Sequence, residues 1–549
     1  MGVRLMEQLL RGNFDWGLFN AYEERIRWDV VNDILGNYRK LLETFSSEEV
    51  EKKGKLTKKI LKDMATIGLF GLNIPESYGG KGLNLQEYLT LVAEMAKLDL
   101  SVSLVSLAHL SIGIKGIILF GSPEQKERYL PRAASGDLIF SYALTEPKHG
   151  SDARHIETRA ELSPDGEYYI LNGTKTYITN ANYAGALTVF AQMDPRNPGF
   201  MGAFIVETGW EGVQIEKDMP KMGLKASSTA TIKFENVKVP RENLIGNPGD
   251  GYKIALAILS YGRLGLAAAA FGLMEQSCED MIKRARSRTQ FGRPIGQFEL
   301  VQEMIVKAEV YKAVTRAMTF FTACILEKAP DASVAVETSH CKLFGTTRAW
   351  NVLYDAMQIH GGAGYLSTLP FEKRMRDFRV ATIFEGTTEI HSIYPPLWIL
   401  RQWKKELAGK SFTDKARFIG SLFSHSREWQ SWGDEPEFQK AQRVCYKLIA
   451  AARRLLTYAM LRYGEKVGEH EFFLRRITHL SLYAFGLIAL SAFLRHEKKR
   501  GALTEKNLAV LDYFTEEAQT VYQEAASVVS SPVEKAHRRL VKISLGENA

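Results

Sequence analysis

Cysteine is scarce in this chain: four of the 549 residues are cysteines, and they lie far apart. No two of them form a CxxC pair; they are Cys278, Cys324, Cys341 and Cys445. This pattern disfavours a disulfide-stapled scaffold and a cysteine-ligated zinc site, and it favours a reducing compartment. We expect the thiols to lie in the core.

A long apolar run is also missing. The longest, residues 480–494, has 15 residues and includes two serines, whereas about 20 are needed for a helix to span a bilayer. The start, MGVRLMEQLL, lacks the apolar core and cleavage site of a secretory signal and the hydroxyl residue of a myristoylation signal. We expect a soluble or membrane-peripheral, cytoplasmic protein in which residues 480–494 form a buried or interfacial helix.

The first 400 residues carry no excess charge of either sign. The net charge of +8 comes from residues 401–549, which hold 25 Lys and Arg against 17 Asp and Glu. Attraction to membrane phosphates would therefore be a property of this tail, although a solvated basic helical surface explains the excess equally well. We predict no nucleic-acid partner.

Common catalytic motifs are absent too. The sequence contains no GxxxxGK[ST], no GxGxxG after a strand, no HExxH and no GxSxG. Their absence disfavours a P-loop enzyme, a Rossmann dehydrogenase, a zincin and a standard serine hydrolase. The histidines do not reach metal-ligand spacing on one helix face, so no metal site is predicted.

The chain has the composition of a folded protein, with 45% hydrophobic and 24% charged residues. The spacing of its hydrophobic residues changes twice along the sequence. Helical spacing gives way to short runs of β-branched and aromatic residues separated by turns, and it returns after residues 246–251. We predict an α+β, mostly α fold. Its parts are an N-terminal helical domain (1–135), a middle antiparallel β domain (136–246), a helical-bundle domain (247–400) with long helices over 252–286, 297–328 and 331–359, and an extra C-terminal helical domain (401–549).

Three segments have features of a binding site, and each also has a simpler explanation. SYALTEPKHGSDA (141–153) is a strand entering a loop of Gly, Pro and hydroxyl residues, which brings backbone N–H groups close to a ligand or merely connects two elements. SRTQFGRPIG (287–296) offers a planar Arg for phosphate, or a plain helix end. IFEGTTEI (383–390) places Glu385 either at a helix start or as a partly buried general base with a raised pKa.

Taken together and in this order, these segments resemble the acyl-CoA dehydrogenase family. LNGTKTYITN (171–180) is similar to the family's flavin-covering strand, and RTQFGRPIG and MQIHGGAGY (357–365) are similar to the segments that complete a neighbouring subunit's FAD site. The resemblance is collinear over roughly residues 15–400. AHLSIGIKGIILFG (108–121), ILSYGRLGLAAA (258–269) and the long tail point to the very-long-chain subgroup.

The resemblance implies FAD-dependent α,β-dehydrogenation of a fatty acyl-CoA to trans-2-enoyl-CoA, as in fatty acid β-oxidation. It implies that Glu385 removes the α-proton while hydride leaves to flavin N5, and that the thioester carbonyl is polarised by the backbone N–H of Glu385 and a flavin ribityl hydroxyl. It further implies a homodimer, an electron-transfer flavoprotein as electron acceptor, and the mitochondrial matrix as the location in a eukaryote.

The resemblance also assigns site residues by position. Those expected to bind FAD are Tyr142, Leu144, Thr145, Tyr177, Ile178, Thr179, Thr387 and Glu389, and, across the dimer interface, Arg288, Gln290, Phe291, Phe298, Gln358, Gly361 and Gly362. Those expected at the acyl-CoA are Ser151, Gly262, Arg263 and Gly386.

Several positions depart from the family pattern. Tyr177 replaces a frequent Trp, and Gly262 stands where some members carry an alternative catalytic Glu, which supports Glu385 as the sole base. Ser103 and Leu107 stand where the long-chain subgroup tends to have Gly at the pocket floor, so we expect them to shorten the acyl cavity.

Other interpretations remain open from the sequence. An acyl-CoA oxidase and a flavin monooxygenase share the fold, although the latter usually lacks a base like Glu385, and a non-catalytic scaffold protein would use the tail for partners. Two basic segments of the tail are compatible with membrane contact, or equally with buried helices that end in charged residues. They are Arg453 and Arg454, beside LIAAA, and HEKKR at 496–500.

Overall fold

The computed structural model describes residues 4–12, 22–423 and 435–546, which are mostly helical with one β-sheet domain, as predicted. The chain packs as two compact units, each made of segments distant in sequence. We call residues 24–312 and 345–387 the sheet unit, and residues 1–23, 313–344 and 388–549 the tail unit. The predicted extension, 401–549, lies wholly within the tail unit.

The sheet unit begins with helices, as the spacing predicts. α6 starts with a capping box in which the Asn84 side chain accepts from the Glu87 N–H and Glu87 accepts from the Asn84 N–H. It then breaks at Asp99, whose backbone is extended (φ −158°, ψ 105°) and whose carboxylate caps the following turn at the Val102 N–H, 3.0 Å away. The helices are α3 (Trp28–Glu43), α4 (Ser47–Lys53), α5 (Lys58–Thr66), α6 (Leu85–Ala108), α7 (Lys115–Phe120) and α8 (Pro123–Ala134).

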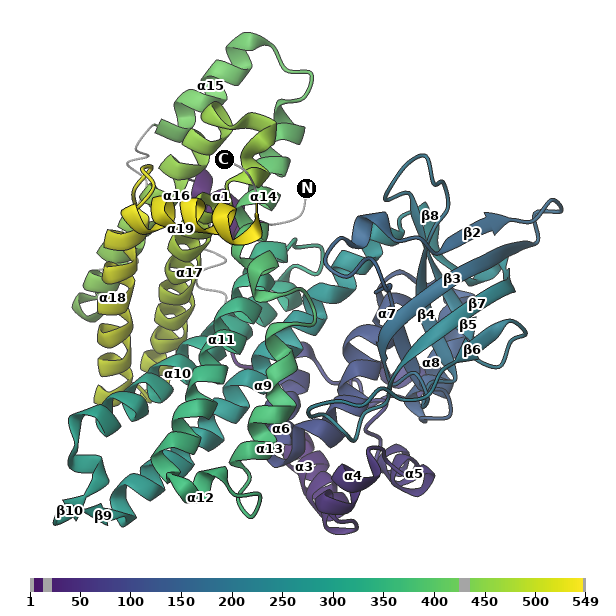
Figure 1. Ribbon diagram of the computed structural model, residues 1–549, viewed down its shortest axis with the longest axis horizontal. Coiled ribbons are helices and arrows are strands. Elements are labelled where there is room, and N and C mark those ends of the chain that lie inside the picture. The colour runs from purple at the N-terminus through teal and green to yellow at the C-terminus, as the bar shows by residue number, and fades with distance from the viewer. Residues whose placement is uncertain (1–3, 13–21, 424–434, 547–549) are drawn as a thin grey trace. The chain divides into compact units, whose positions relative to one another are not determined.

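The sheet has eight strands, seven of them in the order β6-β7-β3-β2-β4-β5-β8, with β1 paired to β4 (Figure 1). Most strand pairs are antiparallel, as predicted, but β1 and β2 each pair with β4 in parallel. The connection between β1 and β2 is a long loop and not a tight hairpin, so the two strands need not pair with each other in antiparallel fashion. The strands are β1 (Phe140–Ala143), β2 (Arg159–Leu162), β3 (Tyr168–Thr179), β4 (Ala186–Gln192), β5 (Met201–Glu207), β6 (Val213–Ile215), β7 (Thr229–Pro240) and β8 (Leu244–Gly249).

Long helices follow the sheet close to the predicted bounds. α9 (Gly251–Ser287) and α10 (Glu299–Lys328) match predicted helices, whereas α11 (Ala335–His360) begins four residues later than expected. A small hairpin of β9 (Thr289–Gln290) and β10 (Arg293–Pro294) joins α9 to α10. Residues 313–344 of α10 and α11 belong to the tail unit, and the sheet unit also holds two short helices, α12 (Gly362–Tyr365) and α13 (Phe371–Phe378).

In the tail unit, α16, α17 and α18 pack against one another (Figure 1). The apolar run at 480–494 lies in α17 and is buried, as one of the two predicted alternatives. Arg453 is also buried, 6% exposed, which agrees with the second of its two predicted alternatives, a buried helix, and not with membrane contact. The helices are α1 (Leu5–Arg11), α14 (Thr388–Leu407), α15 (Phe412–Phe423), α16 (Gln439–Arg462), α17 (Glu471–Lys499), α18 (Glu505–Ala525) and α19 (Pro532–Leu545).

Within the part of the chain that the structure describes, three stretches of helix are long and apolar enough to cross a membrane: residues 85–120, α9 and α17. Most of the apolar part of each is covered by protein, 72%, 61% and 89% respectively. The four cysteines are buried and free, as expected.

One buried histidine joins the helical start of the sheet unit to the sheet. His109 has no exposed surface, its Nδ1 accepts a hydrogen bond from the Phe140 N–H (2.9 Å), and its ring meets Phe70 edge-on. Burial lowers the pKa of His109 to about 4.

The titration of His109 makes stability depend on pH in a defined direction. The unfolded chain protonates this ring near pH 6.5, whereas the folded protein does so only near pH 4. The contribution of neutral His109 to the free energy of unfolding is therefore complete above about pH 6.5. It is lost as the pH falls from there to about 4, by up to about 3 kcal/mol.

We predict that His109→Asn, which keeps an oxygen acceptor for Phe140, loses about 2 kcal/mol less stability between pH 7 and pH 4.5 than the wild type does. Urea unfolding at both pH values measures this difference, in which titrations common to both proteins cancel. The exposed His155→Asn serves as the control and should follow the wild type. Equal pH slopes for wild type and His109→Asn would contradict the assignment.

Candidate functional site

The predicted catalytic carboxylate lies on strained backbone. Glu385 has φ +57°, the left-handed region that a residue with a side chain enters at a cost of about 1–2 kcal/mol. It is followed by Gly386, with φ +92°, just before α14 begins. Such strain persists where the surroundings require one orientation of a side chain, and it is a feature of functional sites.

The position of the Glu385 carboxylate depends on a glycine of α9. A Cβ atom at Gly262 would lie 2.6 Å from Oε2 and 2.9 Å from Oε1 of Glu385. The carboxylate therefore occupies the space of the side chain that Gly262 lacks. The adjacent Arg263 is buried, and its Nε donates a long hydrogen bond, 3.5 Å, to the Glu385 carbonyl.

A cavity of about 60 Å³ lies at this carboxylate. Leu107 lines it, as the sequence predicts for a floor residue, but Ser103 is not among the lining residues that the structure describes. The reason is that the Ser103 side chain turns back along α6, where Oγ donates to the Leu100 carbonyl at 3.1 Å. Leucine, alanine and glycine dominate the walls, which are Tyr88, Val92, Leu100, Leu104, Leu107, Ala108, Ser111, Ile112, Thr179, Gly262, Gly265, Leu266, Ala269, Phe384 and Glu385.

Tyr142 approaches the same carboxylate from the sheet. Its pKa is raised well above the usual value, first by burial and then by the negative charge of Glu385, while Arg263 acts in the opposite direction. Its hydroxyl donates to the Ala255 carbonyl at 3.3 Å. Residues from β1, α9 and the turn before α14 are thus brought together.

A buried ion pair holds the loop that follows β1. Lys175 Nζ lies 2.6 Å from Glu146 Oε1 and donates to the Leu144 carbonyl at 3.0 Å, and neither charged side chain is more than 3% exposed. Burial lowers the pKa of Lys175 to about 8, against the effect of the carboxylate. Burial alone would raise the pKa of Glu146, but Lys175 and hydrogen bonds from the residues at 157 and 158 lower it below its usual value.

The two predicted flavin segments meet beside this pair. The Thr176 N–H donates to the Thr145 carbonyl at 2.9 Å. At a bulge in β3, Tyr177 has φ +58° and stands 67% exposed, Ile178 is buried, and Thr179 lines the cavity of Glu385. An exposed aromatic ring next to hydroxyl groups and an apolar wall suits a flat, partly polar ring such as isoalloxazine, so these residues fit FAD.

Most of the remaining predicted site residues are exposed. Arg288 and Gln290 are exposed on the β9–β10 hairpin, whose Phe291 is 93% exposed with φ +52° and packs edge-on against Phe298. Gln358, Gly361 and Gly362 are exposed where α11 ends and α12 begins, Ser151 is exposed in the loop after β1, Thr387 is half-buried, and Glu389 is exposed in the first turn of α14.

Sequence reasoning missed part of the cavity wall and the ion pair. Leu266 and Ala269 lie four and seven residues after Gly262, so a helical face through Gly262 already contained them. Glu146 and Lys175 stood inside the segments that were singled out, but nothing in their spacing indicates that they meet. Among the described residues, no group of three or more His, Cys, Asp or Glu side chains could hold a metal ion.

Three family models match the chain in sequence order. The N-terminal domain of acyl-CoA dehydrogenase matches residues 34–137, its middle domain residues 141–237 and its C-terminal domain residues 249–393. Together they contain every element that contributes to the cavity of Glu385.

Individual proteins extend the similarity into the tail. The human very long-chain specific acyl-CoA dehydrogenase, mitochondrial, is 32% identical over 85% of this chain and 74% of its own length. The structure of an acyl-CoA dehydrogenase complexed with FAD from Bacillus anthracis superposes with a TM-score of 0.81 at 27% identity, covering 96% of this chain and 93% of that one. The structure of butyryl-CoA dehydrogenase from Megasphaera elsdenii aligns with 69% of this chain and 100% of its own length, with a TM-score of 0.64 and 32% identity.

We predict that Lys175→Met destabilises the protein by about 3 kcal/mol or more, because it leaves the Glu146 carboxylate buried without its partner. Urea unfolding measures the loss. Lys148→Met is the matched control: Lys148 is exposed and lies 3.2 Å from Glu157 at the surface, so this change should cost less than about 1 kcal/mol. Equal effects of the two substitutions would show that the buried pair does not anchor the loop.

Proposed function

The chain belongs to the acyl-CoA dehydrogenase family, and we propose on that premise that it oxidises a fatty acyl-CoA to trans-2-enoyl-CoA with Glu385 as the general base. The observation that carries the proposal is the position of the Glu385 carboxylate over Gly262, at an apolar cavity. In the family some members carry the base at the position of Gly262. A carboxylate from either position would reach the same place, which supports Glu385 as the sole base here.

Each nearby residue has a part in this chemistry. The substrate's α-proton passes to the Glu385 carboxylate, and the left-handed backbone at Glu385 fixes the direction of that carboxylate. The backbone N–H of Glu385 polarises the thioester carbonyl. The apolar walls exclude water and align the acyl chain. Arg263, Ser151 and Gly386 contact the CoA thioester.

FAD is the family's cofactor, and when bound it supplies the hydride acceptor for the β-hydrogen. Tyr142, Leu144 and Thr145 line one side of the flavin ring, and the segment from Tyr177 to Thr179 covers the other. Thr387 and Glu389 meet the cofactor near the base. The electrons then pass to an electron-transfer flavoprotein, in the cytoplasm or, in a eukaryote, in the mitochondrial matrix.

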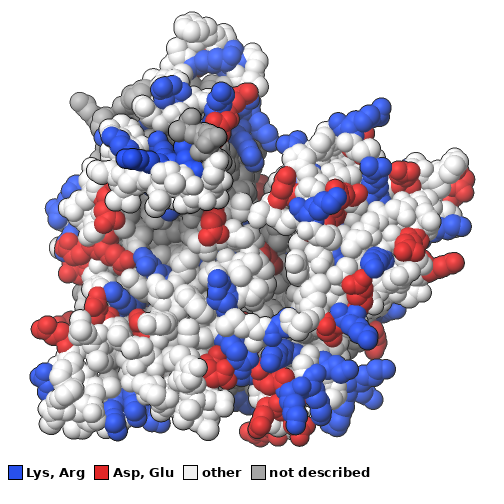
Figure 2. Space-filling view, viewed as in Figure 1, with Lys and Arg blue, Asp and Glu red and all other residues white. Residues whose placement is uncertain are grey.

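A second copy of the chain completes the FAD site in this proposal. The hairpin with Arg288 and Phe291 exposes an aromatic side chain almost fully, and other large apolar residues lie exposed near it in the chain and on α12. The surface around β9, β10 and α12 is largely uncharged in Figure 2. An apolar surface of this kind is typical of an interface, which supports a homodimer.

The tail also offers a surface for peripheral membrane contact, on α19. This helix has no buried residue; Val533, Leu540 and Ile543 lie on one face and are 78%, 65% and 69% exposed. Three cations stand on the opposite face, Lys535, Arg538 and Lys542, and Arg539 lies at the edge of the apolar face beside Ile543. Figure 2 shows Lys and Arg side chains over this helix. An exposed apolar face beside a basic one suits an anionic bilayer surface.

We predict that Glu385→Gln keeps bound FAD and binds acyl-CoA but reduces the flavin at least a thousandfold more slowly, because an amide cannot accept the α-proton. Anaerobic mixing with a saturated acyl-CoA, followed by the loss of flavin absorbance, measures the rate. The exposed Glu161→Gln of β2 is the control and should behave as the wild type. Bleaching of Glu385→Gln at the wild-type rate would remove Glu385 as the base, and no bleaching of the wild type by any acyl-CoA would favour the scaffold alternative.

For the membrane, we predict that the double substitution Leu540→Glu and Ile543→Glu lowers binding to vesicles of mixed neutral and anionic phospholipid at least tenfold, because the apolar face of α19 no longer inserts. Vesicle co-sedimentation measures the bound fraction. Leu461→Glu is the control, since Leu461 is 58% exposed on α16 of the same unit. If the double variant binds like the wild type, α19 is not the membrane surface.

A further inference from the structure

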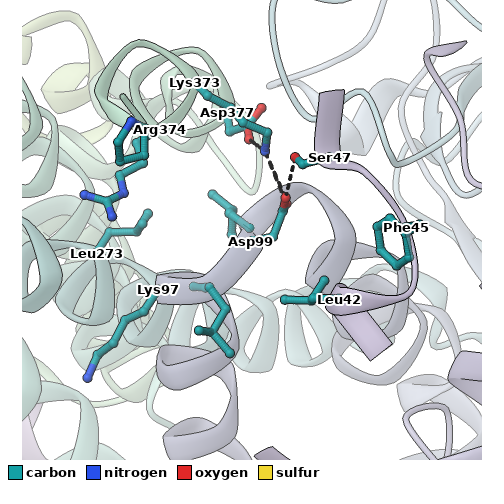
Figure 3. Close-up of a pocket in the computed structure, with 13 residues that line it drawn as sticks. Leu42, Phe45, Ser47, Lys97, Asp99, Leu273, Lys373, Arg374 and Asp377 are labelled. Carbon is teal, nitrogen blue, oxygen red and sulfur yellow. Dashed lines mark hydrogen bonds and ion pairs between the residues drawn. The ribbon is translucent and has the colours of Figure 1, made fainter. Parts of the chain in front are cut away.

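A second and larger chamber, of about 250 Å³, lies in the sheet unit close to the cavity of Glu385 (Figure 3). Leu42, Phe45 and Leu273 give it apolar walls, and charged residues of α6 and α13 surround it. Its complete lining is Leu42, Phe45, Ser47, Ala96, Lys97, Leu98, Asp99, Leu100, Leu273, Pro370, Lys373, Arg374 and Asp377.

Leu100 lines both the chamber and the cavity of Glu385. It follows Asp99, where the extended backbone breaks α6 into two helical halves. Leu100 therefore lies at the boundary of the two spaces, directly after the break in α6.

The same two helices form walls of both spaces. On α6, Tyr88 and Val92 line the cavity of Glu385, and Ala96, one turn further along the same face, lines the chamber. On α9, Ala269 lines the cavity and Leu273, also one turn further, lines the chamber. The groove between α6 and α9 thus leads from Glu385 past Leu100 into the chamber.

The length of this groove can be compared with that of an acyl chain. At about 1.5 Å of helix rise per residue, Ala269 lies about 10 Å and Leu273 about 16 Å beyond Gly262. An extended alkyl chain advances about 1.25 Å per carbon, given a C–C bond of about 1.5 Å. If the α-carbon lies level with Gly262, a chain reaches Ala269, at the end of the cavity, roughly eight carbons further on. It reaches Leu273, in the wall of the chamber, roughly thirteen carbons beyond the α-carbon.

The charges around the chamber are already engaged with one another. Lys373 lies 3.2 Å from Asp99 and 2.7 Å from Asp377, and Ser47 donates to Asp99 at 3.2 Å (Figure 3). Arg374 pairs with Asp280 at 2.6 Å. Because these groups are paired, an alkyl chain entering along the leucine walls would leave no charge without its partner.

We propose that the chamber receives the distal end of a long, straight acyl chain, and that Leu100 is the residue that this chain displaces to enter it. The inference rests on the proposed dehydrogenase function and deepens it: acyl groups of about 14 carbons or more use the chamber, and octanoyl groups end before Leu100. Although Leu107 narrows the first cavity, the length of chain that the enzyme accepts is set further along, at Leu100.

The test uses thiol labelling, because all four native cysteines are buried. Leu98 lines the chamber and is 40% exposed, so Leu98→Cys creates a reactive thiol there; Leu162→Cys, at a 51% exposed leucine of β2, is the matched control. The full-length protein with FAD is labelled with a maleimide in the presence of octanoyl-CoA or hexadecanoyl-CoA, and flavin bleaching is followed in parallel.

We predict that hexadecanoyl-CoA slows labelling of Leu98→Cys at least fivefold, that octanoyl-CoA leaves it unchanged, and that neither ligand affects Leu162→Cys. Protection of Leu98→Cys by hexadecanoyl-CoA without bleaching would support the chamber while removing the dehydrogenase function. Bleaching by hexadecanoyl-CoA without protection would overturn the chamber and leave the function standing. Equal protection by both acyl-CoAs would also overturn it, and the absence of both bleaching and protection would overturn both proposals.

Discussion

The contact between the Glu385 carboxylate and Gly262 is the constraint on which the site depends. The carboxylate fills the space next to α9 that any larger residue at 262 would take, and the backbone of Glu385 adopts a left-handed conformation beside it. The cost of about 1–2 kcal/mol for that backbone is offset by the packing around it. Any residue larger than glycine at 262 would therefore displace the Glu385 carboxylate.

The sheet domain contributes a buried ion pair to the candidate site. Lys175 and Glu146 are costly to bury singly, but as a pair they fix the loop after β1 and, through the Leu144 carbonyl, the start of that loop. Thr145 and Thr176 then join the two segments that we assign to the flavin. The buried ion pair thus fixes the position of the two segments that we assign to the flavin.

Much of the fold follows from local pattern, and its failures have local reasons. Helical spacing predicted α9 and α10 closely because long amphipathic stretches are bounded by Gly and Pro loops. Pairing direction was missed for β1, since parallel and antiparallel strands have similar residues. The charge of Arg453 left membrane contact and a buried helix equally open, and the packing of α16 decides for burial. The first half of the polar segment at 431–438, residues 431–434, lies outside the described residues.

The sequence by itself determined the family, the order of the helical and β regions and the position of Glu385, because each of these is written in short contiguous segments. Only the tertiary structure decided that Glu385 meets Gly262, that Ser103 turns away from the cavity, and that Leu100 stands between two spaces. Those relations join residues far apart in the chain, through a break in α6 and the packing of α6 on α9. Periodicity records which face of a helix is apolar, but not which partner that face meets.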